Sequence, residues 1–385
     1  MLIVRRAAIL ASVRKRVLKS GKTRWTVDYR DQTGVRRYKD FERKKEAEEY
    51  LDEVRRLLRD GTFVHDKATC SVSEAADLHL ESASVRALEP GTQDQYEQHV
   101  RLYIKPHLGH VLLTKLTEPM IQEFLDDIVE EQSAAMAKRV LGTLNRVIKE
   151  AQRRNLVGRN IIADKSIKAP RAEPYVKRMP ERHELSGLLA NTDDRGQVLL
   201  MAAMLTGMRL GELRALTWDD VRFDDRIIRV RKASRSDGSV KGTKSASGYR
   251  DIPISGVLGL ELKKWRLQCP VGGKALVFPN GNGNVESGSN IRQRVFIPAM
   301  KAIGLTTEVI GISGKKVEKP AFRFHDLRHA AAALFIEQGM GPKRIQELMG
   351  HSSIQVTFDI YGYLFRDPEA DAAAVDAISA KLLGG

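Results

Sequence analysis

The chain has 385 residues, of which 42% are hydrophobic and 29% charged, a balance typical of a folded protein with two or three domains. No run of about 18 apolar residues occurs, so the sequence offers no candidate for a membrane-spanning helix. The two cysteines, Cys70 and Cys269, form no C-x-x-C pair, which argues against a disulfide framework and a structural zinc site and favours a reducing cytoplasm.

Positive charge is concentrated at the N-terminal end of the chain. The net charge is +15, and residues 1–45 hold fifteen Lys and Arg against four Asp and Glu, so this stretch alone contributes +11. Such a segment is typical of proteins that bind a polyanion, and nucleic acid is the first candidate because each neutralised phosphate releases counterions. A solvated charged surface is the alternative, and charge alone does not separate the two.

The first predicted unit is a small sheet followed by one helix. Residues 1–11 are basic and apolar, and we expect an N-terminal arm there rather than a targeting peptide. From Arg24, basic and apolar residues alternate around a Gln-Thr-Gly turn, which predicts a β-hairpin with one basic face within residues 12–65. A helix should follow, with apolar residues at Ala47, Leu51, Val54 and Leu58. A ribbon of this size can enter a groove of duplex DNA, and the candidate contacts, each equally plausible as ordinary surface, are Arg24, Arg36, Arg37 and Lys39.

The second predicted unit, residues 70–165, is entirely helical. We expect Ser73 to cap its first helix, Thr92 and Gln95 to form a capping box, and Thr117 to precede another helix. The last helix, roughly residues 133–155, is amphipathic. Its apolar side carries Val140, Leu144, Val147, Ile148 and Ala151. Its opposite side carries Lys138, Arg139, Arg146, Lys149 and Arg153. Such a basic stripe suits a helix laid along DNA, although a solvated helix face is about equally common.

A linker and a third unit are predicted for the rest of the chain. Residues 166–180 contain three prolines and four Lys or Arg without periodicity, which is typical of an extended linker. Residues 181–385 should follow as one unit with a strand pair near residues 226–234 and 249–255. Helices are expected near residues 182–206, 256–267, 290–303, 326–339 and 342–349. The expected fold class is therefore mainly α with small β-sheets, in several domains.

Four motifs in the third unit hold polar residues that a core would not favour: TGMRLGELRALTW, KSASGYRDIPI, FHDLRHAAA and LMGHSSIQVTFDIYGYL. Arg209 follows a turn at the end of an apolar helix, and alone it would be taken for a simple ion-pair residue. His325 and Arg328 lie three residues apart at the start of an apolar helix, where backbone N–H groups also attract an anion. Zinc bound by His325 and His329 is the alternative, but the intervening residues lack the glutamate that a metalloprotease helix requires.

Together the motifs supply the groups that phosphodiester transfer without a metal needs. Arg209 and Arg328 would grip the scissile phosphate and stabilise the charge of the transition state. Tyr361 would be the nucleophile, because cations and a base can activate a phenol whose ordinary pKa is about 10. Lys244 would protonate the leaving 5′ oxygen. The groups expected to orient reactants and handle protons are His325 and His351.

The order of these four motifs resembles the catalytic signature of the tyrosine recombinases, the family that includes the phage integrases. In this resemblance Arg209 matches the first arginine, Lys244 the hairpin lysine, and His325 with Arg328 the His-x-x-Arg pair. His351 matches the later histidine and Tyr361 the nucleophile. Lys241, three residues before Lys244, is the alternative lysine.

The resemblance implies a site-specific DNA recombinase that forms a 3′-phosphotyrosine intermediate and integrates or excises a prophage or another mobile element. It implies an arm-type DNA-binding domain at residues 12–65, a SAM-like core-binding domain at 70–165, and a catalytic domain with a C-terminal tail helix at 181–385. The implied partners are double-stranded DNA at core and arm sites, three further copies of the chain in a homotetramer, and an accessory DNA-bending or directionality protein. No cofactor, metal or membrane is implied, and the expected location is the cytoplasm, with the nucleoid.

Two other functions remain open at the level of the sequence. A type I topoisomerase-like enzyme would use the same chemistry to nick and reseal one duplex, but a separate arm-binding domain argues against it. A non-catalytic DNA-binding regulator would not need the polar residues of the four motifs. A metal-dependent nuclease would need a carboxylate cluster, and none accompanies the arginine and histidine motifs.

Overall fold

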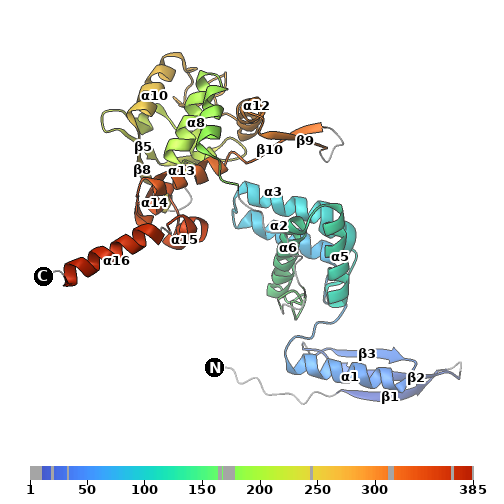
Figure 1. Cartoon of the computed structure of the whole chain (residues 1–385). Coiled ribbons are helices and arrows are strands. Elements are labelled where there is room, and N and C mark those ends of the chain that lie inside the picture. Colours follow the sequence, from blue (N-terminus) through green and yellow to red (C-terminus); the bar gives the residue numbers. More distant parts are fainter. Residues whose placement is uncertain are drawn as a thin grey trace, which may run out of the picture. The chain divides into compact units, whose positions relative to one another are not determined.

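The computed structural model describes residues 11–18, 21–32, 34–163, 167, 178–242, 246–310, 316–365 and 368–383. Two compact units divide the chain, Met1–Tyr175 and Val176–Gly385 (Figure 1). Helices dominate and the described sheets have two or three strands each, which confirms the expected fold class. The arm expected at residues 1–11 lies outside the described residues except for Ala11, as does most of the linker expected at 166–180. Among the described residues, we find no helix that combines the length and the apolar character of a membrane span.

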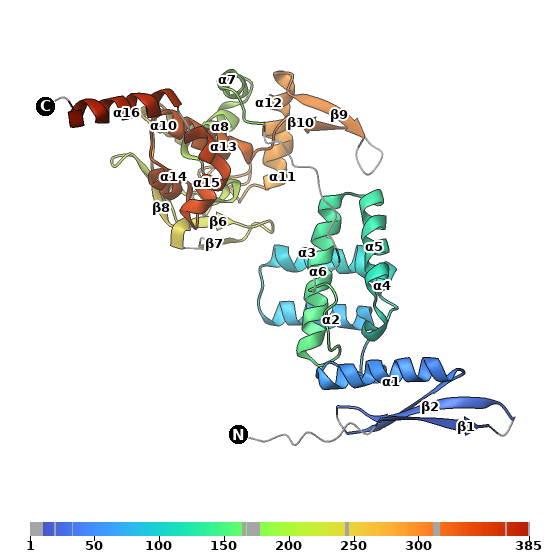
Figure 2. The same cartoon turned by 60° about the horizontal axis from the view of Figure 1, so that its bottom comes forward.

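The first unit begins with a three-stranded antiparallel sheet. Its strands are β1 (Ser12–Val17), β2 (Thr23–Arg30) and β3 (Arg36–Phe41), in the order β1-β2-β3, and the helix α1 (Lys44–Arg59) lies along the sheet (Figure 2). Val27 and Tyr29 of β2 pack with Ala47, Leu51 and Val54 of α1 in one small core. The expected hairpin is β2–β3 and the expected helix is α1. The strand β1 was not expected, because SVRKRV has only two apolar residues with which to show a strand period.

The remainder of the first unit is helical, as expected. Its elements are α2 (Val72–Val85), α3 (Pro90–His99), η1 (Val100–Ile104), α4 (Lys105–Leu108), η2 (Leu113–Lys115), α5 (Glu118–Glu131) and α6 (Ala134–Arg153). Thr117 does precede α5, but the other two capping predictions are wrong. Ser71, not Ser73, caps α2 in a capping box with Glu74. Pro90 starts α3 ahead of Thr92, because proline suits the first helical position, and so Thr92 lies inside the helix.

The helix α6 has the predicted amphipathic character. Val140, Leu144, Val147, Ile148 and Ala151 are all buried in the core of the helical region. The five basic residues expected on the opposite side, Lys138, Arg139, Arg146, Lys149 and Arg153, are exposed. The stripe therefore exists as a surface feature.

The second unit is built around the buried helix α8. Its first elements are α7 (Arg182–Ala190), α8 (Asp194–Thr206), α9 (Leu210–Ala215), η3 (Trp218–Asp220), β4 (Val221–Arg222), β5 (Ile227–Val230), β6 (Lys232–Ser234), β7 (Val240–Gly242), η4 (Ala246–Gly248), β8 (Arg250–Pro253) and α10 (Gly256–Gln268). The helices expected near 182–206 are α7 and α8, and Asp193 caps α8 by accepting a hydrogen bond from Gly196 N at 2.7 Å. The expected strand pair is β5–β8, in a sheet of order β4-β5-β8.

The later elements of this unit carry most of the candidate residues. They are α11 (Gly288–Ile291), η5 (Arg292–Phe296), α12 (Ile297–Ala302), β9 (Thr306–Ile310), β10 (Lys316–Pro320), α13 (Asp326–Glu337), α14 (Pro342–Met349), α15 (Ile354–Tyr361), η6 (Gly362–Phe365) and α16 (Pro368–Leu383). The hairpin β9–β10 and the helix α15 were not expected. The tail helix α16 extends away from the rest of its unit, and its described side chains are exposed (Figure 1).

Candidate active site

Arg209 stands at a sharp turn between two helices. Gly207 ends α8 with a φ of +62°, a conformation that glycine adopts without strain, and Arg209 is the N-cap residue of α9. Its Nη2 donates to the carbonyl of Gly350 at 3.0 Å, and its side chain keeps 41% of its surface exposed. The guanidinium is thus held by the protein on one side and open to a ligand on the other.

A buried carboxylate, Glu212, joins Arg209 to a second arginine. Arg209 Nη1 donates to Glu212 Oε1 at 3.0 Å, and Arg250 Nη2 donates to Glu212 Oε2 at 2.7 Å. Burial alone would raise the pKa of Glu212, but the hydrogen bonds and charge of Arg250 outweigh it and hold this pKa below its usual range. Glu212 is therefore ionised at neutral pH, and its hydrogen bonds hold Arg209 and Arg250 in place.

Arg328, on the first turn of α13, is almost fully buried. It donates to two main-chain carbonyls, those of Gly207 and Met349. Burial and the nearby charge of Arg209 lower the pKa of Arg328, yet an arginine remains charged at pH 7. Two positive guanidinium groups are therefore held in one region, which is the electrostatic requirement for an anion site.

The two candidate histidines lie near enough to these arginines for the arginine charges to act on both rings. His325 is the N-cap residue of α13 and is exposed, although partial desolvation of its ring and the charge of Arg328 lower its pKa. His351 follows α14 and is buried, with Nδ1 2.9 Å from Thr357 Oγ1. Burial, followed by the charges of Arg328 and Arg209, lowers the pKa of His351 to about 4. His351 is therefore neutral at physiological pH.

Tyr361 ends α15 and is completely buried. Its ring stacks on that of His351, with centroids 6.3 Å apart, and its Oη lies 2.7 Å from His329 Nδ1. Burial raises the pKa of Tyr361 to about 12, and the charge of Arg328 partly opposes this rise. The phenol is consequently protonated at neutral pH, and it could act as a nucleophile only if another group took up its proton.

The structure thus brings five of the six predicted catalytic residues together. They are Arg209, His325, Arg328, His351 and Tyr361. The sixth, Lys244, lies outside the described residues. Its alternative, Lys241, is exposed on β7, opposite Ala233 of β6. Gly211 of α9 packs so closely on this hairpin that an added Cβ would lie 2.8 Å from Ser234 O, which places the base of the hairpin beside Arg209.

Three residues that contribute to this geometry were not predicted. Glu212 and Arg250 are 38 residues apart in the sequence, and nothing in either motif indicates their ion pair. His329 was considered only as a zinc ligand, whereas its Nδ1 is engaged by Tyr361. Its position directly after Arg328, one helical turn from His325, is the signal that could have identified it. Among the described residues, no group of three or more His, Cys, Asp or Glu is arranged to hold a metal.

The candidate DNA contacts of the sheet do not share one face, and this part of the prediction is wrong. Neighbouring residues of a strand point to opposite sides, so Arg36 and Arg37 cannot lie together. Lys39 lies over Tyr50 of α1, with Nζ 4.1 Å from the ring centroid, and Arg37 is on the same side. Arg24 and Arg36 point to the open face, where their partners are Glu42 and Asp28. The strand register adds Arg14, Arg16 and Arg30 to that open face.

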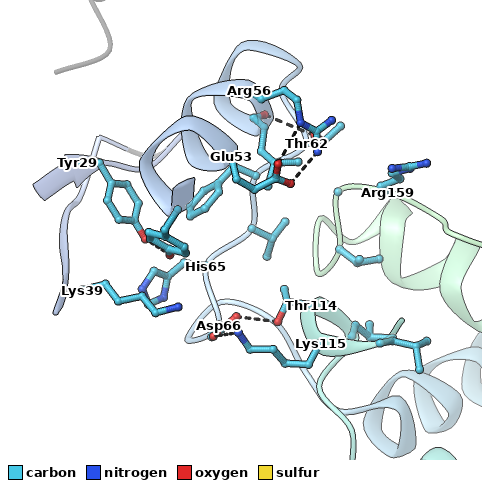
Figure 3. Close-up of a pocket in the computed structure, with 18 of the residues that line it drawn as sticks. Tyr29, Lys39, Glu53, Arg56, Thr62, His65, Asp66, Thr114, Lys115 and Arg159 are labelled. Atoms are coloured by element: carbon cyan, nitrogen blue, oxygen red, sulfur yellow. Dashed lines mark hydrogen bonds and ion pairs between the residues drawn. The ribbon is translucent and has the colours of Figure 1, made fainter. Parts of the chain in front are cut away.

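A separate pocket lies in the first unit, between the sheet region and the helices (Figure 3). Asp66 lines this pocket, where its carboxylate accepts a hydrogen bond from Thr114 Oγ1 at 2.8 Å and forms an ion pair with Lys115 Nζ at 2.9 Å. Glu53 is paired with Arg56 at its rim. Most charges that line this pocket are neutralised within it, so we regard it as a joint between the two regions and not as a reaction site.

Two family models match the chain. Residues 179–365 match the phage integrase family, and residues 72–167 match the phage integrase central domain. A tyrosine recombinase XerC-like protein of Caldanaerobacter subterraneus subsp. tengcongensis is 25% identical to the chain, covering 94% of it and 97% of the relative. The ICEBs1 integrase of Bacillus subtilis is also 25% identical, covering 86% of the chain and 89% of the relative.

Solved structures share the fold. The Tn1549 transposon integrase in complex with a circular intermediate DNA aligns with a TM-score of 0.64 at 19% identity, covering 80% of this chain and 100% of that one. A lambda integrase tetramer bound to a Holliday junction aligns with a TM-score of 0.58 at 20% identity, covering 88% and 95%. The chain belongs to the phage integrase family of tyrosine recombinases and is a site-specific recombinase that cleaves and rejoins DNA strands.

Proposed function

We propose that Tyr361 attacks the scissile phosphate and forms a 3′-phosphotyrosine bond, while Arg209 and Arg328 hold the non-bridging oxygens. The observation that carries this proposal is the convergence of both guanidinium groups on the region around Tyr361 and His351. Positive charge that is fixed in advance stabilises the extra negative charge of a pentacoordinate transition state without reorganisation. The leaving 5′ oxygen takes its proton from Lys244. The neutral imidazole rings of His325 and His351 donate hydrogen bonds to the phosphate.

The reaction conserves bond energy, so it needs neither ATP nor a metal. Attack by the phenol exchanges one phosphodiester for another, and a 5′ hydroxyl from a second duplex reverses the step. Integration or excision of a mobile element follows when four protomers carry out this exchange through a Holliday junction. A lambda integrase tetramer on such a junction supports this assembly by its likeness in fold. An accessory protein that bends DNA or sets direction completes the proposed complex.

The other domains supply the DNA contacts. We assign residues 12–65 to arm sites and residues 70–165, with the basic stripe of α6, to the core site, where the catalytic domain at 181–385 also binds. The open face of the sheet is the proposed arm-site surface, since it gathers Arg14, Arg16, Arg24, Arg30 and Arg36. The residues proposed for the core-site phosphates are Lys138, Arg139, Arg146, Lys149 and Arg153, all of them exposed on α6. The proposed setting is the cytoplasm, with the nucleoid.

Covalent trapping tests the proposal. A nicked suicide substrate that carries the attachment site is incubated with the chain in EDTA, and the denatured products are separated by size. The wild type should form a 3′-linked adduct that Tyr361→Phe lacks, while Tyr363→Phe, a matched change at an exposed tyrosine, should retain it. An adduct with Tyr361→Phe would transfer the role to Tyr363, and no adduct with any form would favour a DNA-binding regulator.

A further inference from the structure

We infer that His329 accepts the proton of Tyr361 during strand cleavage, an inference that rests on the proposed role of Tyr361 as nucleophile. Tyr361 Oη and His329 Nδ1 are 2.7 Å apart, and both side chains are buried. No other contact of the structure joins a side-chain base to that hydroxyl among the described residues. His351, which stacks on the same ring, directs its own Nδ1 to Thr357 instead.

The charge beside the imidazole favours one tautomer. On its other side, His329 Nε2 faces Asp326 Oδ1 at 4.0 Å, and Asp326 is itself held by Arg323, whose main-chain N donates to Asp326 Oδ2 at 2.7 Å. A carboxylate near Nε2 favours the tautomer with its proton on Nε2. Nδ1 then carries the lone pair and accepts the hydrogen bond that Tyr361 Oη donates. Nδ1 of His329 therefore points at the hydroxyl proton that Tyr361 must lose.

The backbone fixes this alignment. Asp326 and His329 are three residues apart on α13, so they lie on one face of the helix. The ring of His325, one turn before His329, meets it edge to face at a centroid distance of 5.3 Å. His329 is thus confined between His325, Asp326 and Tyr361. A ring confined in this way keeps its Nδ1 directed at the hydroxyl of Tyr361.

The proton balance of the step is simple. Tyr361 Oη bonds to phosphorus as its proton passes to His329 Nδ1, and the bond from phosphorus to the 5′ oxygen breaks as that oxygen takes a proton from the general acid. On rejoining, the 5′ hydroxyl attacks phosphorus and gives its proton back to the general acid, and the bond from phosphorus to Tyr361 Oη breaks as the imidazolium returns its proton to that oxygen. Asp326 stabilises the transient imidazolium. The base and the general acid are both back in their starting protonation states after one cleavage and one ligation.

The substitution that tests this role is His329→Asn. An asparagine places a neutral acceptor near the position of Nδ1, so it preserves a hydrogen bond to Tyr361 but takes up no proton. His183→Asn is the matched control, because His183 is an exposed histidine of α7 in the same unit. Single-turnover cleavage of the suicide substrate should slow roughly 10²-fold in His329→Asn, the usual contribution of a general base, and remain unchanged in His183→Asn.

A sulfur substitution in the substrate separates a base from a merely structural residue. A 5′-bridging phosphorothiolate leaves without a proton, so it should restore cleavage by a variant that lacks the general acid, such as Lys244→Ala. It should not restore His329→Asn, whose defect lies at the nucleophile. Rescue of His329→Asn by the thiolate, or an unchanged cleavage rate on the normal substrate, would overturn the inference.

Two further measurements keep the outcomes distinct. If thermal unfolding shows that His329→Asn does not fold, His329→Gln replaces it in the same assay, and added imidazole should speed cleavage by His329→Ala. Absence of that rescue in folded His329→Ala counts against the inference. Failure of the wild type to form any adduct would instead overturn the proposed function, whereas wild-type cleavage together with full activity of the His329 variant overturns only the role of His329.

Discussion

Glu212 and Arg250 form a buried ion pair, with Glu212 Oε2 2.7 Å from Arg250 Nη2 and about 3% and 5% of the two side chains exposed. Removal of one partner from such a pair leaves the other charge buried and costs roughly 3–5 kcal/mol. We therefore expect Glu212→Gln to destabilise the protein by about that amount at pH 7, measured by denaturant unfolding. Glu337→Gln breaks an exposed pair with Arg182 and should cost no more than about 1 kcal/mol.

The same pair has a predictable pH dependence. The pKa of Glu212 is lower in the folded protein than its usual value of about 4.3. Its stabilising contribution is therefore complete above that usual value and is lost as the pH falls through the folded pKa. The stability difference between wild type and Glu212→Gln should shrink only at such acidic pH. A difference that already shrinks between pH 7 and 5 would contradict the assignment.

Tyr361 should titrate at an unusually high pH. Its folded pKa of about 12 exceeds the value of about 10 for an unfolded tyrosine, because burial opposes the phenolate. The contribution of this group to stability is thus complete below pH 10 and is lost as the pH rises towards 12. Absorbance at 295 nm, recorded as a difference between wild type and Tyr361→Phe, should show this late titration. A difference midpoint near 10 would mean that the phenol is not sealed from water.

The two faces of the N-terminal sheet should differ in DNA binding. Arg14→Gln with Arg16→Gln removes two charges from the open face, and Arg37→Gln with Lys39→Gln removes two from the side of α1. Each lost phosphate contact lowers the slope of log affinity against log salt concentration by about 0.9, so the first double variant should lose about 1.8. The second should lose little, and equal losses would mean that the sheet does not bind through its open face.

Gly350 should tolerate no side chain. Its φ is +63°, and a Cβ there would lie 2.9 Å from Ser247 O and 3.0 Å from Arg250 Nη1. We expect Gly350→Ala to cost about 1–2 kcal/mol or more and to shift the carbonyl that binds Arg209, which should slow cleavage roughly 10²-fold. Gly273→Ala, in a turn of the same unit, meets open space without a positive φ and should affect neither property.

The sequence predicted elements whose signal is local. The apolar spacing of α6 identified both its buried and its exposed side, and the turn at Gly207 correctly placed Arg209 between α8 and α9. The strand β1 was not predicted because much of its length is basic. It is a strand because it pairs with β2, and this pairing is not visible in its own sequence. A hairpin with one basic face was expected, but Arg36 and Arg37 are neighbours on β3, and the strand period places them on opposite faces.

The same distinction applies to the site. Each predicted catalytic residue lies in a short motif whose neighbours mark it, and five of the six converge in the structure. The contacts that hold them are long-range. Arg250 reaches Glu212 across 38 residues, and His329 reaches Tyr361 across 32, so the partners become visible only when the chain is folded.

Main-chain oxygens of Gly207 and Gly350, each at the end of a helix, hold Arg328 and Arg209. Each of these long side chains has about 2 kcal/mol of rotamer entropy to lose. Because the chain itself provides the restraining contacts, that loss occurs during folding and not when a phosphate enters the site. The free energy of DNA contact is then left for other work, such as bending the duplex and bringing two recombining strands into register.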